Sequence, residues 1–157
     1  MNLSNVNKVF IVNLWGKSFN GFSKGELSNS FCALAEDFFT SKGCEIKRTN
    51  VADEYDVEEE LEKYKWADVV FYQSPTNWMG MPWEAKKWAD EVWTPGMSGA
   101  LCNGDGRSSK TPEDGYGTGG TLEGTSYLLS LTFNAPKGSF DRSDQYLFEG
   151  KSVDDLW

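Results

Sequence analysis

Apolar and polar positions form two kinds of pattern along the chain. Residues 8–13 form a short apolar run, which is typical of a strand buried on both faces. From residue 26 the period becomes that of a helix, with apolar side chains at steps of four, three and four: Leu27, Phe31, Leu34 and Phe38. Gly43 is a natural stop for this helix. The pattern therefore predicts a strand, a polar loop at 16–25 and a helix that buries this apolar face.

The same alternation predicts three further strands and two further helices. The strands are expected at residues 44–51, 67–72 and 127–133. One helix is expected at 56–65. Another ends at the break formed by residues 94–96 and is marked by four apolar positions: Met81, Ala85, Trp88 and Val92. Strands that alternate with helices indicate right-handed βαβ units and a parallel sheet, so we predict an α/β fold.

One segment does not follow this alternation of strands and helices. Residues 96–124 hold nine of the sixteen glycines and little apolar periodicity. Such a length is unusual for a plain connection in a compact domain. Two interpretations are open: a mobile surface insertion, or an excursion that covers a site.

Charge narrows the classes of function. Acidic residues outnumber basic ones, 24 to 15, and the formal net charge is −9, so phosphate backbones and anionic membranes are repelled. An anionic cofactor would depend on backbone N–H groups and helix N-termini. No run approaches the ~18 apolar residues of a membrane span. We expect no nucleic-acid partner and no membrane insertion.

The residue types that are missing narrow the chemistry further. Histidine is absent, which excludes histidine-based triads, metal ligands and proton relays. The three cysteines, Cys32, Cys44 and Cys102, form no CxxC pair. This usage is typical of a reduced, cytoplasmic protein without a metal site. Any chemistry must come from other side chains or from a bound cofactor.

Three segments follow predicted strands, and ligands of open parallel sheets lie beyond the carboxyl ends of strands. Residues 23–30 offer hydroxyls and N–H donors to a phosphate, although serine and asparagine there are more often plain helix caps. Residues 75–83 hold two prolines and two tryptophans, which suits the edge of a flat heterocycle or a turn plugged into the core. Residues 132–136 offer threonine and asparagine to ring carbonyls and nitrogens. Neither a P-loop nor a dinucleotide fingerprint is present.

Several strings within and beside these segments resemble one known family. They are Trp66-Ala67-Asp68-Val69-Val70, the 75–83 turn, the 130–136 string and Asp144-Gln145. From Lys8 to Asp154 the chain is similar to the modulator-of-drug-activity-B family, whose members are flavodoxin-like, FAD-dependent NAD(P)H:quinone oxidoreductases. The resemblance implies one flavodoxin-like domain over residues 1–157, a three-layer α/β sandwich in which residues 96–124 form a long glycine-rich excursion.

The resemblance also implies a cofactor and its site. FAD would accept hydride from NADPH and pass two electrons to a quinone in a ping-pong scheme, in which flavin chemistry needs no histidine. The implied cofactor-binding residues are Ser23, Lys24, Gly25, Glu26, Leu27, Ser28, Asn29 and Ser30 for the pyrophosphate and ribityl chain, and Pro75, Thr76, Asn77, Trp78, Thr132, Phe133, Asn134 and Ala135 around the isoalloxazine. Tyr116 would reach the ring from the long loop and donate to a quinone oxygen. In this family the flavin lies at the interface of a homodimer.

The chain departs from the family at its end. Family members continue beyond Trp157 with another strand and a closing helix, so the last strand and helix of the fold are expected to be missing and the strand at 127–131 to have an open, apolar edge. Two alternatives to a quinone reductase follow. One is a flavodoxin-like electron carrier, for which an acidic surface suits docking to basic redox partners. The other is a non-catalytic fragment.

Overall fold

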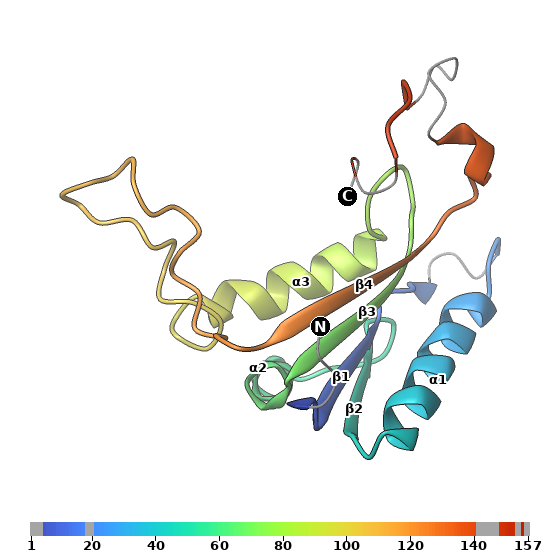
Figure 1. The fold of residues 1–157 in the computed structure, drawn as a ribbon, viewed down its shortest axis with the longest axis horizontal. Coiled ribbons are helices and arrows are strands. Elements are labelled where there is room, and N and C mark those ends of the chain that lie inside the picture. Colours follow the sequence, from blue (N-terminus) through green and yellow to red (C-terminus); the bar gives the residue numbers. More distant parts are fainter. Residues whose placement is uncertain (1–4, 18–20, 141–147, 153–154, 156–157) are drawn as a thin grey trace.

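The computed structural model describes residues 5–17, 21–140, 148–152 and 155, so Asp144-Gln145 and Asp154 of the predicted resemblance lie outside the described residues. The elements are β1 (Lys8–Asn13), α1 (Glu26–Ser41), β2 (Glu45–Asn50), α2 (Val57–Trp66), β3 (Val69–Pro75), α3 (Trp83–Gly96), β4 (Ser126–Thr132) and the short 3-10 helix η3 (Lys137–Ser139). Helix α1 covers one face of the sheet, and α2 and α3 cover the other (Figure 1). The predicted α/β sandwich is confirmed.

The four strands form one parallel sheet in the order β2-β1-β3-β4. β3 runs to Pro75, further than the predicted strand at 67–72, because its pairing with β4 continues to the register pair Pro75 and Thr132. Strand β4 lies at one edge of this sheet, as predicted. Its apolar side chains are partly uncovered, with Tyr127 76% and Leu129 44% exposed.

Helix α1 buries a different face from the predicted one. The side chains against the sheet are Ser28, Cys32, Ala35 and Phe39. The four apolar side chains that were expected to be buried are 37% to 64% exposed: Leu27, Phe31, Leu34 and Phe38. Both sets repeat at steps of four, three and four, so the period alone cannot distinguish them. Three of the four buried side chains, Ser28, Cys32 and Ala35, are small, which lets this stripe pack closely against the sheet.

Helix α3 packs through three of its four predicted positions, Ala85, Trp88 and Val92. The ring of Trp88 is fully buried and stacks on Tyr64 of α2, with 6.3 Å between ring centroids. Met81 does not belong to this face, because it precedes the helix and is 39% exposed. Among the helices that the structure describes, none combines the length and the apolar character needed to cross a membrane.

The segment 97–125, which joins α3 to β4, projects away from the sheet (Figure 1). It is held by local contacts, including bridges between Ser98 and Asn103 and between Cys102 and Gly120. Because a crossover helix returns the chain to the start of the next strand, this segment leaves from the amino edge of the sheet. Within one chain it is a surface excursion and does not cover the carboxyl edge.

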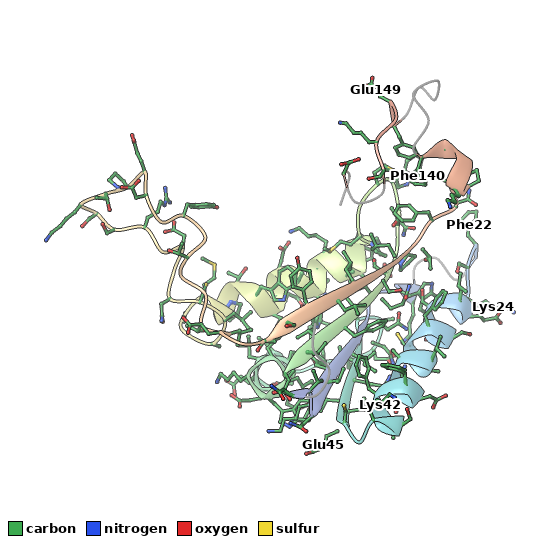
Figure 2. The ribbon with its side chains drawn as sticks, in the orientation of Figure 1. Phe22, Lys24, Lys42, Glu45, Phe140 and Glu149 are labelled. Atoms are coloured by element: carbon green, nitrogen blue, oxygen red, sulfur yellow. The ribbon has the colours of Figure 1, made fainter. Side chains whose placement is uncertain are left out.

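A small aromatic cluster follows β4. The ring of Phe140 lies 5.5 Å from that of Phe133 and stacks on Phe148 at 4.4 Å, measured between centroids. Phe140 and Phe148 are buried. Figure 2 shows Phe140 beyond the carboxyl ends of the strands, at the opposite end of the molecule from Lys42 and Glu45, which mark the amino edge.

Candidate functional site

The three segments predicted to bind a ligand follow β1, β3 and β4, and all three start from the same edge of the sheet. These strands are adjacent and parallel, so their carboxyl ends lie side by side. The register pairs Asn13 at the end of β1 with Gln73 of β3. The loops after β3 and β4 are tied directly, because the Thr76 N–H donates to the Thr132 carbonyl over 2.9 Å. The predicted segments therefore meet at one place.

The first loop enters α1 through Gly25, which is in the left-handed conformation with φ 73°. Its N–H donates to the hydroxyl of Ser23 over 3.3 Å. In the described part of the chain no side chain caps α1, so none competes for the N–H groups of its first turn. Figure 2 shows Phe22 and Lys24 beside this end of α1, with Lys24 supplying a positive side chain at a positively polarised helix terminus. This end of α1 suits an anionic group.

The predicted residues at the start of α1 do not all face the loop. Ser28 is buried against the sheet. The hydroxyl of Ser30 donates back to the Glu26 carbonyl within the helix, over 2.8 Å. Asn29 accepts a hydrogen bond from the Asn13 side chain, 2.8 Å between Nδ2 and Oδ1. The Asn13–Asn29 bond joins the end of β1 to the first turn of α1, and this fixes the helix start over the sheet edge.

An ion pair ties the first loop to the end of β2. Lys17 donates to a carboxylate oxygen of Asp53 over 2.9 Å, and Asn50 donates to the other oxygen over 3.1 Å. These two hydrogen bonds, led by that from Lys17, hold the pKa of Asp53 below its ordinary value. The carboxylate stays charged at neutral pH and keeps the loop beside the sheet.

The second loop makes a tight turn at residues 77–80. Asn77 and Gly80 exchange two backbone hydrogen bonds of 2.8 and 3.0 Å. The two central residues both have positive φ, 51° at Trp78 and 65° at Met79, a conformation that side chains other than glycine adopt at a cost. Trp78 is 100% exposed. The interpretation of this turn as a plug of the core is therefore wrong for Trp78, whose ring is exposed to solvent in the single chain.

The third segment, after β4, contributes Thr132 through its carbonyl and Phe133 through its ring. Phe133 packs against Phe140, which holds the segment over the carboxyl edge. Asn134 is exposed and Ala135 is half-buried. Both positions follow β4 directly, beside the loop after β3.

Tyr116 lies on the excursion, apart from the other predicted site residues. It is 76% exposed, and the guanidinium of Arg107 sits 5.2 Å from its ring centroid. Since the excursion leaves from the amino edge and projects outward (Figure 1), it does not bring Tyr116 to the carboxyl edge of its own chain. A role for Tyr116 at a ring remains a prediction that requires a second chain.

Buried polar atoms at the carboxyl edge lack partners in the described structure. Gln73 is fully buried, and neither its amide nitrogen nor its amide oxygen has a hydrogen-bond partner there. The Thr76 hydroxyl, in the loop after β3, has no partner there either. Unpaired buried polar groups are costly, about 1–3 kcal/mol each. Polar atoms without partners and a helix start without a side-chain cap fit a polar cofactor such as a flavin nucleotide.

Sequence reasoning missed three residues of this edge: Asn13, Trp15 and Gln73. Asn13 and Gln73 are polar residues at the ends of otherwise apolar strands, and that position was a usable signal. The sequence gives no such signal for Trp15, because a tryptophan after a strand is ordinarily part of the core. Among the described residues, no cluster of acidic and cysteine side chains could hold a metal ion.

Comparison with known proteins agrees with this architecture. A family model described as a flavodoxin-like fold matches residues 4–157. The chain is 47% identical over 142 residues to the NADPH:quinone oxidoreductase MdaB of Haemophilus influenzae, which covers 90% of this chain and 72% of that protein. The chain belongs to the modulator-of-drug-activity-B family. The family's flavodoxin-like fold accounts for the parallel sheet and for the meeting of three strand-end loops.

Solved structures support the fold of this family member. An NADPH-quinone reductase from P. pentosaceus superposes with a TM-score of 0.58 at 18% identity, over 96% of this chain and 71% of that one. General stress protein 14 of Treponema denticola, in complex with FMN, gives a TM-score of 0.59 at 18% identity, over 96% and 73%. At such identities the likeness concerns the fold alone.

Proposed function

We propose that this protein oxidises NAD(P)H and reduces quinones by two electrons through a bound flavin. The observation that carries the proposal is the meeting of the three strand-end loops at an edge with unpartnered buried polar groups. Membership of the modulator-of-drug-activity-B family supports the same activity. A bound flavin supplies hydride-transfer chemistry. The net reaction moves a hydride from the nicotinamide and a proton from solvent to the quinone, which leaves as the hydroquinone.

In this proposal different segments would bind different parts of the cofactor. The start of α1 would face the phosphates with N–H groups that no described side chain caps. Residues 75–78 and 132–135 would border the flat ring, and the Thr76 hydroxyl, which has no partner in the described structure, would bond one of its polar atoms. Trp78, whose ring is exposed in the single chain, would offer an aromatic face to the isoalloxazine.

We further propose that the cofactor is FAD and the nicotinamide substrate NADPH. The motif at residues 23–30 together with the 75–83 turn supports FAD, and the H. influenzae relative is named for NADPH. Mass spectrometry of the cofactor released from purified protein tests the first part. Release of FAD is the expected result, and release of FMN alone contradicts it.

We also propose that the site is shared between two chains of a homodimer, which the position of the excursion supports. Tyr116 cannot serve its own chain's carboxyl edge, so in a homodimer it would donate to a quinone oxygen at the partner's flavin. The excursion would then cover a site after all, but on the neighbouring chain.

Steady-state assays test the proposed activity. With NADPH and a simple benzoquinone, double-reciprocal plots at several fixed quinone concentrations should give parallel lines, as expected when both substrates use one ring in turn. A flavin-bound protein that does not oxidise NADPH would instead be an electron carrier, and a protein that takes up no flavin would be a non-catalytic fragment.

A further inference from the structure

Trp15 and Gly25 are packed against one another more closely than any side chain at position 25 would allow. A Cβ atom placed on Gly25 would lie 2.5, 2.7 and 2.9 Å from three ring carbons of Trp15. Its φ of 73° is itself unfavourable for other residues. The backbone of Gly25 therefore packs directly against the flat indole ring of Trp15.

Hydrogen bonds from the end of β1 hold Trp15 in place. The backbone N–H of Trp15 donates to the side-chain oxygen of Asn13 over 3.2 Å, and the other end of the Asn13 amide holds Asn29 of α1. Gly25 in turn accepts the hydrogen bond from the Asn29 N–H, 2.9 Å, that begins the helix. Asn13, Trp15, Gly25 and Asn29 thus form one closed unit around the start of α1.

The hydrogen-bonding capacity of the indole does not contribute to this unit. Its nitrogen is buried and has no hydrogen-bond partner in the described structure. A core tryptophan whose ring mattered through its N–H would have an acceptor beside it. What the ring contributes here is a flat apolar surface of a particular shape.

We propose that Trp15 is a positioning residue for the flavin. Its ring holds Gly25 in the left-handed conformation, so that the N–H groups of the first turn of α1 point at the cofactor's phosphates before the cofactor binds. The inference rests on the proposed function, and it concerns Trp15, which touches Gly25 and not the reacting ring atoms.

The expected effect follows from the entropy of ordering this loop. Without the ring, the backbone at Gly25 has to be ordered when the cofactor binds, and ordering one residue costs about 1–2 kcal/mol, which corresponds to roughly a tenfold rise in the Kd for flavin. Phenylalanine keeps a flat ring and removes an N–H that makes no bond in the described structure. Trp15→Phe should therefore bind flavin within about threefold of the wild-type protein, because a flat aromatic ring still packs against the backbone of Gly25.

The test titrates FAD into cofactor-free protein and follows flavin fluorescence, for the wild type, Trp15→Phe, Trp15→Ala and the control Trp66→Ala. Trp66 is also half-buried, but it lies at the far end of α2. The expected result is weaker binding in Trp15→Ala, near-normal binding in Trp15→Phe and normal binding in Trp66→Ala, whatever the thermal stability of that control. If Trp15→Ala fails to fold, Trp15→Leu takes its place with the same expectation.

Two results would overturn the inference: wild-type affinity in Trp15→Ala or its substitute, or equally weak binding in Trp15→Phe and the smaller variant. Either leaves the proposed function intact, because the wild-type protein still binds flavin. If the wild type binds no flavin at all, the proposed function fails first and the positioning role fails with it.

Discussion

Trp78 and Trp88 show how one residue type serves two purposes in this chain. Trp88 is fully buried between α3 and the sheet, whereas Trp78 is fully exposed on the strained turn after β3. We expect Trp88→Ala to lower the free energy of unfolding by about 3–5 kcal/mol. Trp78→Ala should change it little but should shift the visible spectrum of bound flavin. Thermal melts test this expectation, since an equal loss of melting temperature in both variants would show that Trp78 is a core residue.

The strain at Trp78 leads to a second expectation. Glycine tolerates the φ of 51° found there, and alanine does not. Trp78→Gly should therefore melt at a higher temperature than Trp78→Ala, although glycine usually destabilises relative to alanine. The reverse order of melting temperatures would show that the turn relaxes out of this conformation.

Cys32 is expected to make stability depend on pH in the alkaline range. Burial, the largest cause, raises its pKa from 9.0 to about 11 in the folded protein, partly offset by Arg48. The unfolded chain therefore loses this proton first. The contribution of Cys32 to the free energy of unfolding is complete below pH 9, and it is lost as the pH rises through the pKa of the folded protein. Between pH 9 and 11, melting temperature should fall more steeply in the wild type than in Cys32→Ala, and parallel slopes would contradict this.

At the scale of elements, the strands were more predictable than the faces of the helices. β1 was predicted residue for residue, because a run of apolar residues in a two-sided sheet leaves little choice. The buried face of α1 was not, because Leu27 and Ser28 begin stripes of identical period. Which stripe faces the sheet depends on how closely the backbone must approach, and that is decided by the sheet rather than by the helix.

The open side of β4 carries a prediction about association. Tyr127 and Leu129 are exposed on the edge strand and line an apolar cavity of 220 Å³ against α3. A strand edge with exposed apolar side chains pairs readily with other chains. The chain of residues 1–157 should therefore form species larger than a dimer on size exclusion, and more so at higher concentration.

A charged side chain on this edge should reduce that association. Tyr127→Lys is the test variant, and Met97→Lys at the end of α3 is the control, since Met97 is also an exposed apolar side chain, 50% exposed, and lies outside β4. Only the first should lower the proportion of large species. A sharp single species in the unsubstituted chain would show that the edge is covered by other means.

At the scale of the whole molecule, the site could be predicted in its parts but not in its assembly. The three strand-end loops were identified by composition and by motif, and the parallel topology brings them together. The separation of Tyr116 from these loops follows from the same parallel topology, because a segment between a crossover helix and the next strand leaves from the amino edge of the sheet. The course of the segment beyond that edge was not predictable, because residues 96–124 have little apolar periodicity.

The proposed sharing of Tyr116 between chains is open to a complementation test. Gly25→Val should abolish flavin binding, since its side chain would collide with Trp15, and Tyr116→Ala should slow quinone reduction. In a mixed dimer, one site would combine an intact flavin loop with an intact partner Tyr116. Mixing the two variants after mild dissociation should restore activity above the sum of the parts. No gain on mixing would place Tyr116 outside the partner's site.

The central claim is that this carboxyl edge holds a flavin which NADPH reduces and a quinone reoxidises. The most direct measurement is the visible spectrum of the FAD-loaded protein under anaerobic conditions, during addition of NADPH and then of a benzoquinone. The account predicts loss of the flavin absorption with NADPH and its return with the quinone, without loss of cofactor from the protein. A bound flavin whose absorption does not change with NADPH, or a protein that takes up no flavin, would contradict it.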